Sequence, residues 1–549
     1  MGSLLNLIIK NKKNMFIFII ILTLFSSIPI FILGSVPYGH DLNFHLSRIQ
    51  GLSDNIKNLD FFNGVYKEYY NGYGYANGLF YPDIFLYLPA LLRAFGMKIT
   101  VSYKIFIIFI NFFSILSMYL TVKGISKNKN AAVLASLIYA FVPYRLVDLY
   151  ERAALGEALA FIFVPLVFYG IYEIIFGDYK KFWVLTIGMT GLILSHILST
   201  YMVGIVLLII CLINIKRFVR EKERVLYLLI AALITLFLTS YFLFPMIEQM
   251  MSQTFKYSST GALDQFKLSN RVVNPLLLFL EIPHIYKLLN LEYWVPSGIG
   301  IMFIYLIYIL LLNRKKNDSF TNQALVISVF TLVIVCIKPF WELGIVERTL
   351  YLVQFPWRFY MFPTILLTIC GSICMCKNGL SLKKFTITLM LSMVSLGSMF
   401  YLMVRAYKVK YLDEYSAAFN EYLPAEVTKN YILNNPNRIN SNNSVDTNII
   451  DKGSYKIIEF NLKEENDNDT YLELPLVYYK GYMASCDGND LKVYKSDKGL
   501  VTINIESRKE GSVKVRYSGT IVQIFTRFIS LISAIIFSIY IYKEVKHEK

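Results

Sequence analysis

The sequence predicts an all-α polytopic membrane protein with about twelve transmembrane helices and a small extracytoplasmic β domain before the last helix. The first observation is composition, because the 549 residues are 56% hydrophobic and 17% charged, whereas a soluble domain carries roughly 25% charged residues. The mean hydropathy is +0.50. The second observation is a series of long apolar runs, and the third is the placement of Lys and Arg on one side of those runs.

Most of the apolar runs are about as long as a bilayer-spanning helix, which needs roughly 17–25 residues. They lie at residues 14–34, 102–122, 131–144, 158–176, 182–199, 201–215, 225–246, 297–312, 323–340, 359–376, 385–404 and 520–542. The runs at 131–144 and 201–215 are short and need flanking residues to cross. We therefore expect a multi-span transmembrane domain over 1–404 and a last helix with its tail over 520–549.

Basic residues gather in the connections on one side of the predicted spans. The clusters are Lys10/Lys12/Lys13, Lys123/Lys127/Lys129, Lys180/Lys181, Lys216/Arg217/Arg220/Lys222/Arg224, Arg314/Lys315/Lys316, Lys377/Lys383/Lys384 and Lys543/Lys546/Lys549. Cytoplasmic loops are enriched in Lys and Arg, so we expect a cell-membrane protein with both termini cytoplasmic and residues 405–519 extracytoplasmic. Because this topology accounts for the net charge of +16, we expect membrane lipids and no nucleic acid as partners.

The extracytoplasmic region 405–519 has two parts. Residues 430–450 are rich in Asn and predict an irregular linker. Between about 454 and 518, apolar and polar residues alternate, and Asp487-Gly488 and Lys498-Gly499 are turn signals. This pattern predicts a small antiparallel β domain of the sandwich type.

The first external loop, 35–101, begins with the motif PYGHDLNFHLSRIQGL. Asp41, His45 and Arg48 follow one another at i, i+4 and i+7, so a helix would place them on one face. On an exposed face, an acid, an imidazole and a guanidinium would bind a metal ion and a phosphate. Alternatively, Asp41 caps the helix and Arg48 is a solvated charge, and the spacing does not decide between the two.

Further along this loop lie six tyrosines and an apolar segment too short to cross the membrane. The tyrosines are residues 66, 69, 70, 73, 75 and 81. They could stack on a sugar, but ordinary interfacial aromatic residues are the favoured interpretation. The apolar segment 84–95 predicts an interfacial or re-entrant helix.

Three later motifs place ionisable residues at the ends of predicted spans, where charge is costly and indicates function. Arg145, Asp148, Arg152 and Glu157 lie in the motif PYRLVDLYERAALGEALA, and the alternative role is a structural pair of Arg and carboxylate that fixes two helix ends. Arg152 and Glu157 are five residues apart, so they meet only if the chain bends, and Gly156 would permit the bend. His196 in LSHILST is either a site residue or, the favoured reading, a packing histidine. Arg358 in QFPWRF would contact headgroups or a lipid-linked phosphate.

The motifs GHDLNFHLSRI, GLFYPDIFLYLPALL, PYRLVDLYERAALGEALAFIFVPL, LSHILST and QFPWRF, in this order over roughly residues 14–360, resemble bacterial membrane proteins known as 6-pyruvoyl-tetrahydropterin synthase-related. Those proteins are similar to the YfhO-like membrane proteins and more distantly to the GT-C glycosyltransferases. Pterin chemistry itself is excluded, because the soluble synthase needs a three-histidine zinc site that includes a close His-x-His pair. The five histidines of this chain contain no such pair.

The GT-C resemblance implies a GT-C-like fold and transfer of a sugar from a polyprenyl-phosphate donor to a cell-envelope glycan or lipid acceptor on the outer face. It implies that Asp41 acts as the base or as the ligand of a divalent ion such as Mg or Mn. His40-Asp41 stands where many such proteins have two acidic residues, which leaves metal dependence open. The remaining expected site residues are His45, Arg48, Arg152, Glu157 and His196, with Arg358 on the donor phosphate.

The alternative function is non-enzymatic: a lipid or polymer transporter, or an envelope assembly scaffold, that uses the same cavity. If Asp41 is indispensable while the protein still folds, the enzyme is favoured. If activity survives Asp41→Ala and depends on the cavity lining, transport is favoured.

Overall fold

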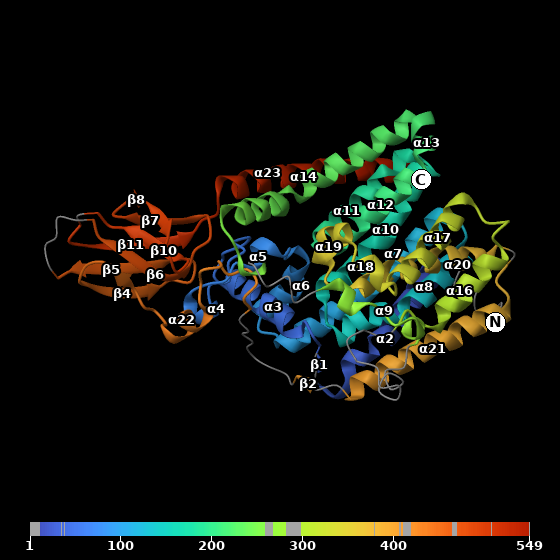
Figure 1. Ribbon diagram of the computed structural model, residues 1–549, viewed down its shortest axis with the longest axis horizontal. Helices are drawn as coiled ribbons and strands as arrows, with labels where there is room; N and C mark the ends of the chain where they lie inside the picture. The colour runs from blue at the N-terminus through green and yellow to red at the C-terminus, as the bar shows by residue number, and fades with distance from the viewer. Residues whose placement is uncertain are drawn as a thin grey trace. The chain divides into compact units, whose positions relative to one another are not determined.

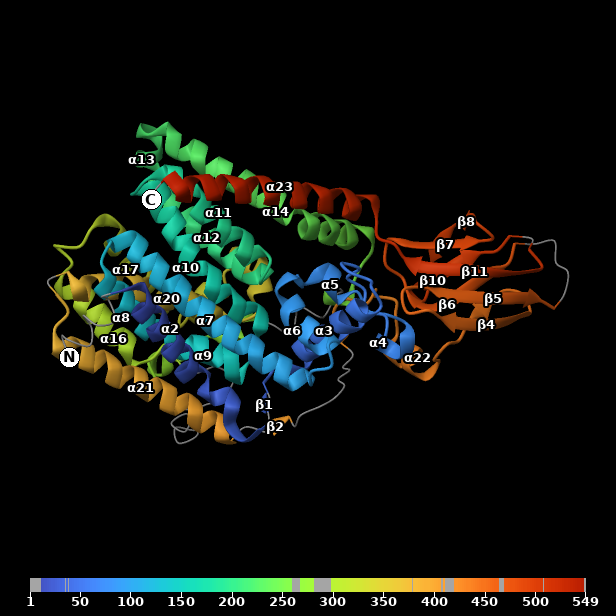
Figure 2. The same ribbon diagram turned by 180° about the vertical axis from the view of Figure 1, so that it is seen from behind.

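The computed structural model describes residues 11–34, 36–37, 39–258, 267–280, 298–377, 379–405, 408–409, 419–463, 469–506 and 508–547. Figures 1 and 2 show a chain built mainly of helices, with strands near its C-terminal end. The chain divides into two compact units. The first unit comprises Met1–His45, Tyr103–Leu236 and Phe266–Tyr411, and the second comprises Leu46–Ser102, Phe237–Gln265 and Leu412–Lys549.

The first unit is a helical bundle. Its longer helices are α2 (Lys12–Ser27), α8 (Lys129–Ala140), α10 (Leu155–Ile175), α11 (Phe182–Ile193), α12 (Ile197–Ile213), α16 (Ile301–Leu312), α17 (Ser319–Ile334), α20 (Met361–Cys376) and α21 (Leu382–Arg405). Three helices continue from one unit into the other, namely α3 (Leu42–Lys57), α7 (Ile99–Ser126) and α14 (Lys222–Ser252). Every expected span therefore overlaps a helix of the described residues. The last span, 520–542, overlaps α23 (Ile521–His547), which belongs to the second unit.

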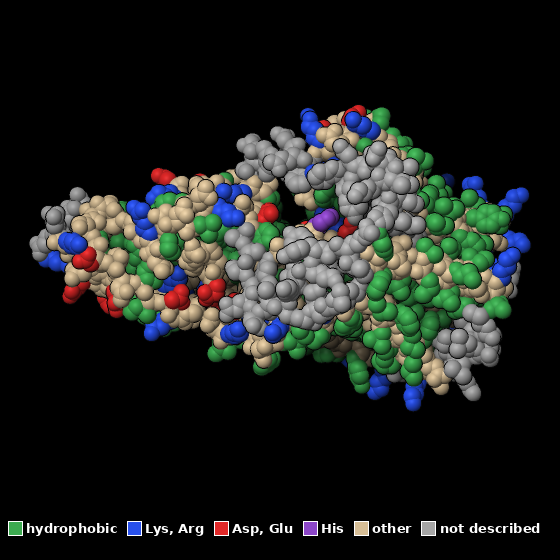
Figure 3. All heavy atoms as spheres, turned by 90° about the horizontal axis from the view of Figure 1, so that it is seen from below, with side chains coloured by type: hydrophobic (Ala, Val, Ile, Leu, Met, Phe, Trp, Pro, Cys, Tyr) green, Lys and Arg blue, Asp and Glu red, His purple; other side chains and the backbone are tan. Residues whose placement is uncertain are grey.

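The described helices confirm a multi-pass membrane protein. Seven of them are long and apolar enough to cross a bilayer, and the bent pair Lys129–Ala140 and Pro143–Glu151 makes eight if it is one span. Shorter apolar helices occupy three further expected spans, at Ile197–Ile213, Ile301–Leu312 and Ser319–Ile334. Another covers Ile84–Ala94, so the helix expected at 84–95 is confirmed while its place at the interface stays a prediction. Figure 3 shows many hydrophobic side chains on the face of the molecule that is in view, as lipid contact requires.

Small residues let α10 and α11 pack closely. A side chain at Gly188 would come within 2.7 Å of the Val167 backbone, so only glycine permits this approach. At the end of α10 two arginines from the basic cluster at 216–224 cap the helix. Arg217 Nη1 donates to the Ile175 carbonyl at 2.9 Å and Arg224 Nη1 to the Ile174 carbonyl at 2.7 Å. Cations stabilise helix C-termini, so part of this cluster has a structural role besides the topological role expected from the sequence.

The second unit contains the β domain that the sequence predicts. One antiparallel sheet has the order β3-β6-β10-β9 and the other β4-β5-β11-β7-β8. Their inner faces share one apolar core that includes Ile458, Leu474, Ile503 and Val513, which makes the domain a sandwich. The strands are β3 (Asn440–Ser441), β4 (Val445–Asp451), β5 (Lys456–Leu462), β6 (Tyr471–Val477), β7 (Tyr482–Cys486), β8 (Asn489–Leu491), β9 (Val493–Lys495), β10 (Leu500–Asn504) and β11 (Glu510–Tyr517).

One sequence expectation about this unit needs correction, and one is confirmed. The Asn-rich stretch 430–450 is not an irregular linker, because it holds most of α22 (Lys429–Asn434) together with β3 and β4. Asparagine side chains there stabilise the fold: Asn440 Nδ2 donates to Glu473 Oε1 at 2.7 Å, and Asn443 Nδ2 to Thr470 Oγ1 at 2.7 Å. The turn signals are confirmed, since Asp487 and Gly488 both have positive φ between β7 and β8.

Five of the six tyrosines of the first loop form a packed core rather than a sugar-stacking wall, and the sixth, Tyr81, is half-buried. Tyr66, Tyr69, Tyr70, Tyr73 and Tyr75 are each at most 3% exposed. Their hydroxyls bond within the unit, for example Tyr69 to the Ser47 carbonyl at 2.5 Å and Tyr73 to the Asn435 carbonyl at 2.7 Å. These rings therefore present no free face to a ligand, and neither the sugar wall nor an interfacial belt describes them.

The expected sidedness can be tested by labelling with a membrane-impermeant maleimide. Cys486 is fully buried, so an introduced cysteine is needed. In intact spheroplasts we expect Asp490→Cys, exposed on the β domain, to be labelled and Lys315→Cys, exposed between α16 and α17, to be labelled only after lysis. The unmodified protein sets the background. Labelling in the opposite order would contradict the predicted topology.

Candidate functional site

A break between α8 and α10 in the first unit builds the site. After α8 come a short turn, α9 (Pro143–Leu146) and a π-helical segment, η3 (Val147–Glu151). The chain bends by 48° between α8 and the segment that α9 and η3 form together. Pro143 starts α9 at a position where its missing N–H costs nothing. Ala153 then has φ +53°, which turns the chain before α10 begins at Leu155. The bend expected at Gly156 is therefore at Ala153.

Arg145 stabilises the break. Its side chain is fully buried and donates from Nε to the Tyr139 carbonyl at 3.0 Å and from Nη2 to the Ala140 carbonyl at 2.6 Å, both at the end of α8. Nη1 donates to Asn111 Oδ1 at 2.6 Å. These bonds satisfy helix-end carbonyls that would otherwise be unpaired in hydrocarbon, so Arg145 has a structural role.

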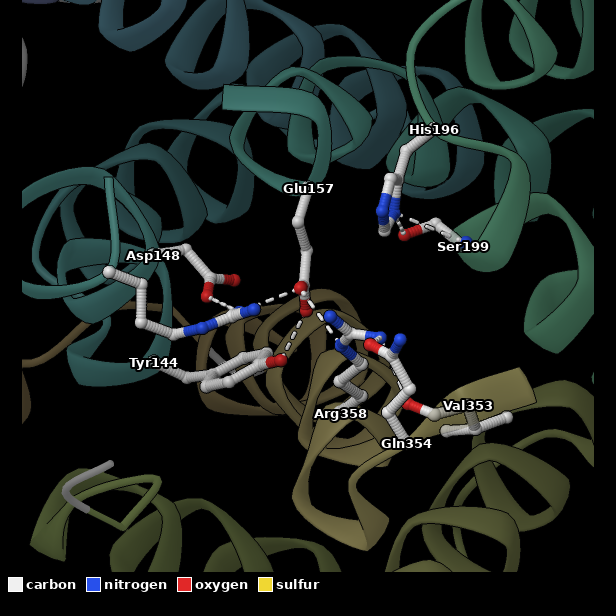
Figure 4. A network of polar contacts seen from close by, with 9 residues as sticks. Tyr144, Asp148, Glu157, His196, Ser199, Val353, Gln354 and Arg358 are labelled. Carbon is white, nitrogen blue, oxygen red and sulfur yellow. Dashed lines mark hydrogen bonds and ion pairs between the residues drawn. The ribbon is translucent and has the colours of Figure 1, made fainter. Parts of the chain in front are cut away.

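Glu157 lies at the centre of a buried network of charged and polar groups (Figure 4). Arg152 Nη1 donates to Glu157 Oε2 at 2.6 Å and also to Asp148 Oδ1. The Tyr144 hydroxyl donates to Glu157 Oε1, and Arg358 Nε is 3.6 Å from Glu157 Oε2. The expected contact between Arg152 and Glu157 is thus confirmed, because the turn at Ala153 brings them together.

Arg358 enters the network from η10 (Pro356–Tyr360), which precedes α20. Its Nη1 donates to the Val353 carbonyl at 2.9 Å and to Gln354 Oε1 at 3.0 Å. Gln354 has φ +65°, an uncommon conformation for a non-glycine residue, and it places the acceptor beside the guanidinium. Trp357 packs under Arg152, with the guanidinium carbon 4.5 Å from the ring centre.

His196 caps α12. The Ser199 backbone N–H donates to His196 Nδ1 at 3.3 Å, and the Ser199 hydroxyl is 2.8 Å from the same nitrogen. Since Nδ1 accepts, the neutral ring carries its proton on Nε2. Figure 4 shows the ring facing the side of the network where Glu157 lies, and the two residues interact electrostatically. His196 therefore combines the packing role with a place at the edge of the network.

Asp41 is held beside the network by backbone contacts. The Asp41 N–H donates to the Arg152 carbonyl at 2.8 Å, and the His40 N–H donates to the Glu151 carbonyl at 3.3 Å. The Asp41 side chain is half-buried and interacts electrostatically with Arg152. Among the described residues, its carboxylate has no hydrogen-bond or ion-pair partner, so the capping role is not what this side chain does in the structure.

Gly39 makes this arrangement possible. A Cβ atom on Gly39 would lie 2.5 Å from the Ala153 Cβ and 3.0 Å from the Ala153 nitrogen. We therefore expect Gly39→Ala to push the Asp41 segment away from Arg152 and to lower stability by about 1–3 kcal/mol, the usual cost of overpacking. Thermal melting of the purified protein measures this. Gly204→Ala, where a Cβ meets nothing within 4 Å, is the matched control, and equal effects of the two changes would contradict the close approach.

His45 and Arg48 do not form the exposed face that their spacing suggested. Both lie in α3 and are at most 2% exposed. Arg48, in the second unit, donates from Nη2 to Asp83 Oδ1 at 2.7 Å and to the Pro82 carbonyl at 2.7 Å. Burial raises the pKa of Asp83 despite the Arg48 charge beside it. These contacts give Arg48 a structural task, and its substrate role and that of His45 stay untested.

The sequence interpretation missed three members of the network: Tyr144, Gln354 and Trp357. Tyr144, Asp148 and Arg152 follow at intervals of four in one motif, and Gln354 and Trp357 flank Arg358 in another. That spacing was the signal in the sequence that could have identified these residues. Two atoms of the network, Asp148 Oδ2 and Trp357 Nε1, are buried without a hydrogen-bond partner.

A divalent ion at Asp41 would need further ligands besides this carboxylate. Among the residues that the structure describes, no group of three or more His, Cys, Asp or Glu side chains lies close enough together to hold a metal ion. In the expected site, Asp41 would supply a single carboxylate ligand to the ion. A magnesium site also uses waters and substrate phosphates, so metal dependence stays a prediction.

Comparison with known proteins gives relatives of low similarity. An uncharacterized protein of Lactococcus lactis subsp. cremoris is 24% identical over 344 residues, which are 60% of this chain and 54% of that protein. The Archaeoglobus fulgidus oligosaccharyltransferase in its apo form has a TM-score of 0.36 at 13% identity, covering 76% of this chain and 57% of that one. The archaeal oligosaccharyltransferase AglB from the same organism, in complex with an inhibitory peptide and a dolichol-phosphate, also has a TM-score of 0.36 at 13% identity. That comparison covers 70% of this chain and 55% of the other.

The chain spans about half the length of these relatives. A family model described as "Family of unknown function (DUF6541)" matches residues 15–337, which is more than half of the chain. The YfhO-like and pterin synthase-related resemblance stays a prediction beside this match. The chain is a member of the DUF6541 family.

Proposed function

We propose that this protein is a membrane glycosyltransferase of the GT-C type, which moves a sugar from a polyprenyl-phosphate donor to a cell-envelope glycan or lipid on the outer face. One observation carries the proposal. The Asp41 carboxylate has no partner among the described residues, yet the backbone holds it beside a buried network with two arginines. An unpaired, positioned carboxylate next to cations is the arrangement that general-base catalysis at a phosphate leaving group needs.

Asp41 accepts the proton of the acceptor hydroxyl while the hydroxyl oxygen forms a bond to the anomeric carbon of the sugar. The bond from that carbon to the donor phosphate oxygen breaks, and its electron pair stays on the phosphate. Asp41 afterwards releases the proton to water, so the products are a glycoside and a polyprenyl phosphate.

Arg152 and Arg358 would bind the phosphate through donors that the network leaves open. Among the described residues, both side-chain hydrogen bonds of Arg152 are donated by its Nη1, and both of those of Arg358 are donated by its Nη1. The network of Asp148, Arg152, Glu157 and Arg358 carries two positive and two negative charges. Its neutrality means that directional N–H bonds, rather than net charge, would select the phosphate.

The proposal is tested by comparing envelope glycans in cells with and without this protein. We expect one sugar to be missing from an envelope glycan or lipid when the protein is absent and to return with the wild-type gene. Return of the sugar with the Asp41→Asn gene would count against Asp41 as the base. Identical glycans in both strains would count against the enzyme altogether.

The internal pairing of the network favours the second candidate, a transporter or an assembly scaffold. Each of the four charged residues already contacts an opposite charge, as in a purely structural clamp. In that case Asp41→Ala would leave the cellular phenotype intact, while changes in the network would remove it together with the folded protein.

A further inference from the structure

The second unit contains a crevice that the proposed transfer reaction does not use. It has a volume of about 550 Å³, including space open to solvent, and lies among the first loop, the end of α14 and the start of α23. The two helices are bonded there, because the Ser240 hydroxyl is 2.9 Å from the Ser530 hydroxyl. The lining is mostly apolar and includes the polar side chains of Asp83, Tyr87, Tyr241, Gln523 and Arg527.

Two of these side chains have hydrogen-bond donors that no group in the described part of the chain accepts from. Arg527 Nη2 donates to the Phe62 carbonyl at 2.5 Å, and among the described residues no other hydrogen bond or ion pair of this guanidinium is present. The Tyr241 hydroxyl is buried and has no hydrogen-bond partner in the described part of the chain. A buried donor without a partner is unfavourable, so a ligand that accepts from both groups would stabilise this crevice.

The local charge favours an anion. Asp83 is neutralised by Arg48 at 2.7 Å, and Asp60 forms an ion pair with Lys67. With Arg527 this makes three positive groups and two negative ones, a balance of +1. Because Arg527 is the member without a carboxylate partner, its guanidinium is the group that an anion would contact.

The ligand must also have a hydrocarbon part. On α23, Ile524, Arg527, Phe528 and Leu531 follow at i, i+3, i+4 and i+7, so they share one face of the helix. The three apolar members, in this order, are 48%, 60% and 59% exposed. The helix α23 is itself apolar and long enough to cross a membrane. An anion at Arg527 therefore lies beside an apolar stripe that faces lipid.

We propose that this crevice binds an anionic phospholipid of the bilayer, with the headgroup phosphate on Arg527 and the Tyr241 hydroxyl and an acyl chain along the stripe of α23. The site is separate from the proposed transfer reaction and needs none of its residues. A zwitterionic phospholipid fits less well, because its headgroup brings a second positive charge next to Arg527.

Native mass spectrometry of the full chain, released from nanodiscs of phosphatidylglycerol and phosphatidylcholine mixed equally, tests the proposal. We expect wild-type protein to retain phosphatidylglycerol preferentially and Arg527→Gln to lose that preference, with binding about tenfold weaker, as for one lost charge-assisted bond. Tyr241→Phe removes a hydroxyl with no partner in the described chain, so it should fold normally and still bind more weakly. Lys543→Gln, an exposed charge at the other end of α23, is the matched control.

Four results would contradict the proposal. The first is equal retention of both lipids by the wild type. The second is an unchanged preference in both Arg527→Gln and Tyr241→Phe. The third is equal loss of preference in Lys543→Gln, which would assign the effect to the charge of the helix as a whole. The fourth is displacement of the lipid by inorganic phosphate alone, which would contradict the role of the acyl chain.

Discussion

Replacing Arg152 or Glu157 by alanine is expected to destabilise the protein by about 3–5 kcal/mol in each case, the cost of leaving a buried charge without its partner. Arg152→Ala leaves Asp148 and Glu157 as neighbouring carboxylates, and Glu157→Ala removes the group that both arginines contact. The double change removes both members of the 2.6 Å pair. It should therefore cost less than the sum of the single changes, by about 1–3 kcal/mol.

Denaturant unfolding in detergent micelles, followed by tryptophan fluorescence, measures this cycle, because Trp357 lies against Arg152. The exposed pair Lys338–Glu342, with an N–O distance of 3.8 Å, is the matched control. Its cycle should give about 0.3–0.5 kcal/mol, as for other exposed pairs on a helix. If the changes at Arg152 and Glu157 are additive, the two residues act separately, and each would be free to bind a different substrate.

Asp41→Asn is expected to lower glycosyl transfer by about 10²–10⁴-fold, the usual contribution of a general base. The stability of the protein should change by no more than about 0.5 kcal/mol, because the Asp41 carboxylate has no partner among the described residues. Transfer is measured as product per folded protein, and folding by thermal melting. This combination separates a chemical role from a structural one.

Asp318→Asn is the control for that change. The Asp318 carboxylate caps α17 by accepting from the Thr321 N–H at 2.7 Å, and asparagine caps a helix about as well. Activity and melting should both stay near wild type. An Asp41→Asn protein with wild-type activity would remove Asp41 from the mechanism.

Much of the fold could be predicted from the sequence because local patterns determine it. Apolar runs gave the positions of the helices, since only helices satisfy their backbone groups inside a membrane. Alternation and the turn at Asp487-Gly488 gave the sandwich. The Asn-rich stretch 430–450 misled because asparagine is typical of loops, whereas here its amides bond to Glu473 and Thr470, which lie about thirty residues further along the chain. Contacts over that separation leave no local pattern.

The site was predictable in part for the same reason. The contact of Arg152 with Glu157 follows from two charges near one span end, but the turn that joins them is at Ala153, whose positive φ is rare for alanine and has no sequence signal. Arg48 shares a helical face with His45 by spacing, yet its charge is satisfied by Asp83, thirty-five residues away. Burial decides such cases, and it depends on tertiary packing.

The most direct test of the proposed function is the turnover of a lipid-linked sugar by the purified full chain in liposomes. Polyprenyl-phosphate-linked sugars and an extract of envelope acceptors are added, and free polyprenyl phosphate and glycosylated acceptor are quantified by mass spectrometry. We expect the wild type to form both products in equal amounts and Asp41→Asn to form neither, with both proteins equally folded. Equal product from the two proteins would contradict the account. So would a wild-type protein that forms no product, if cells that lack this protein have altered envelope glycans.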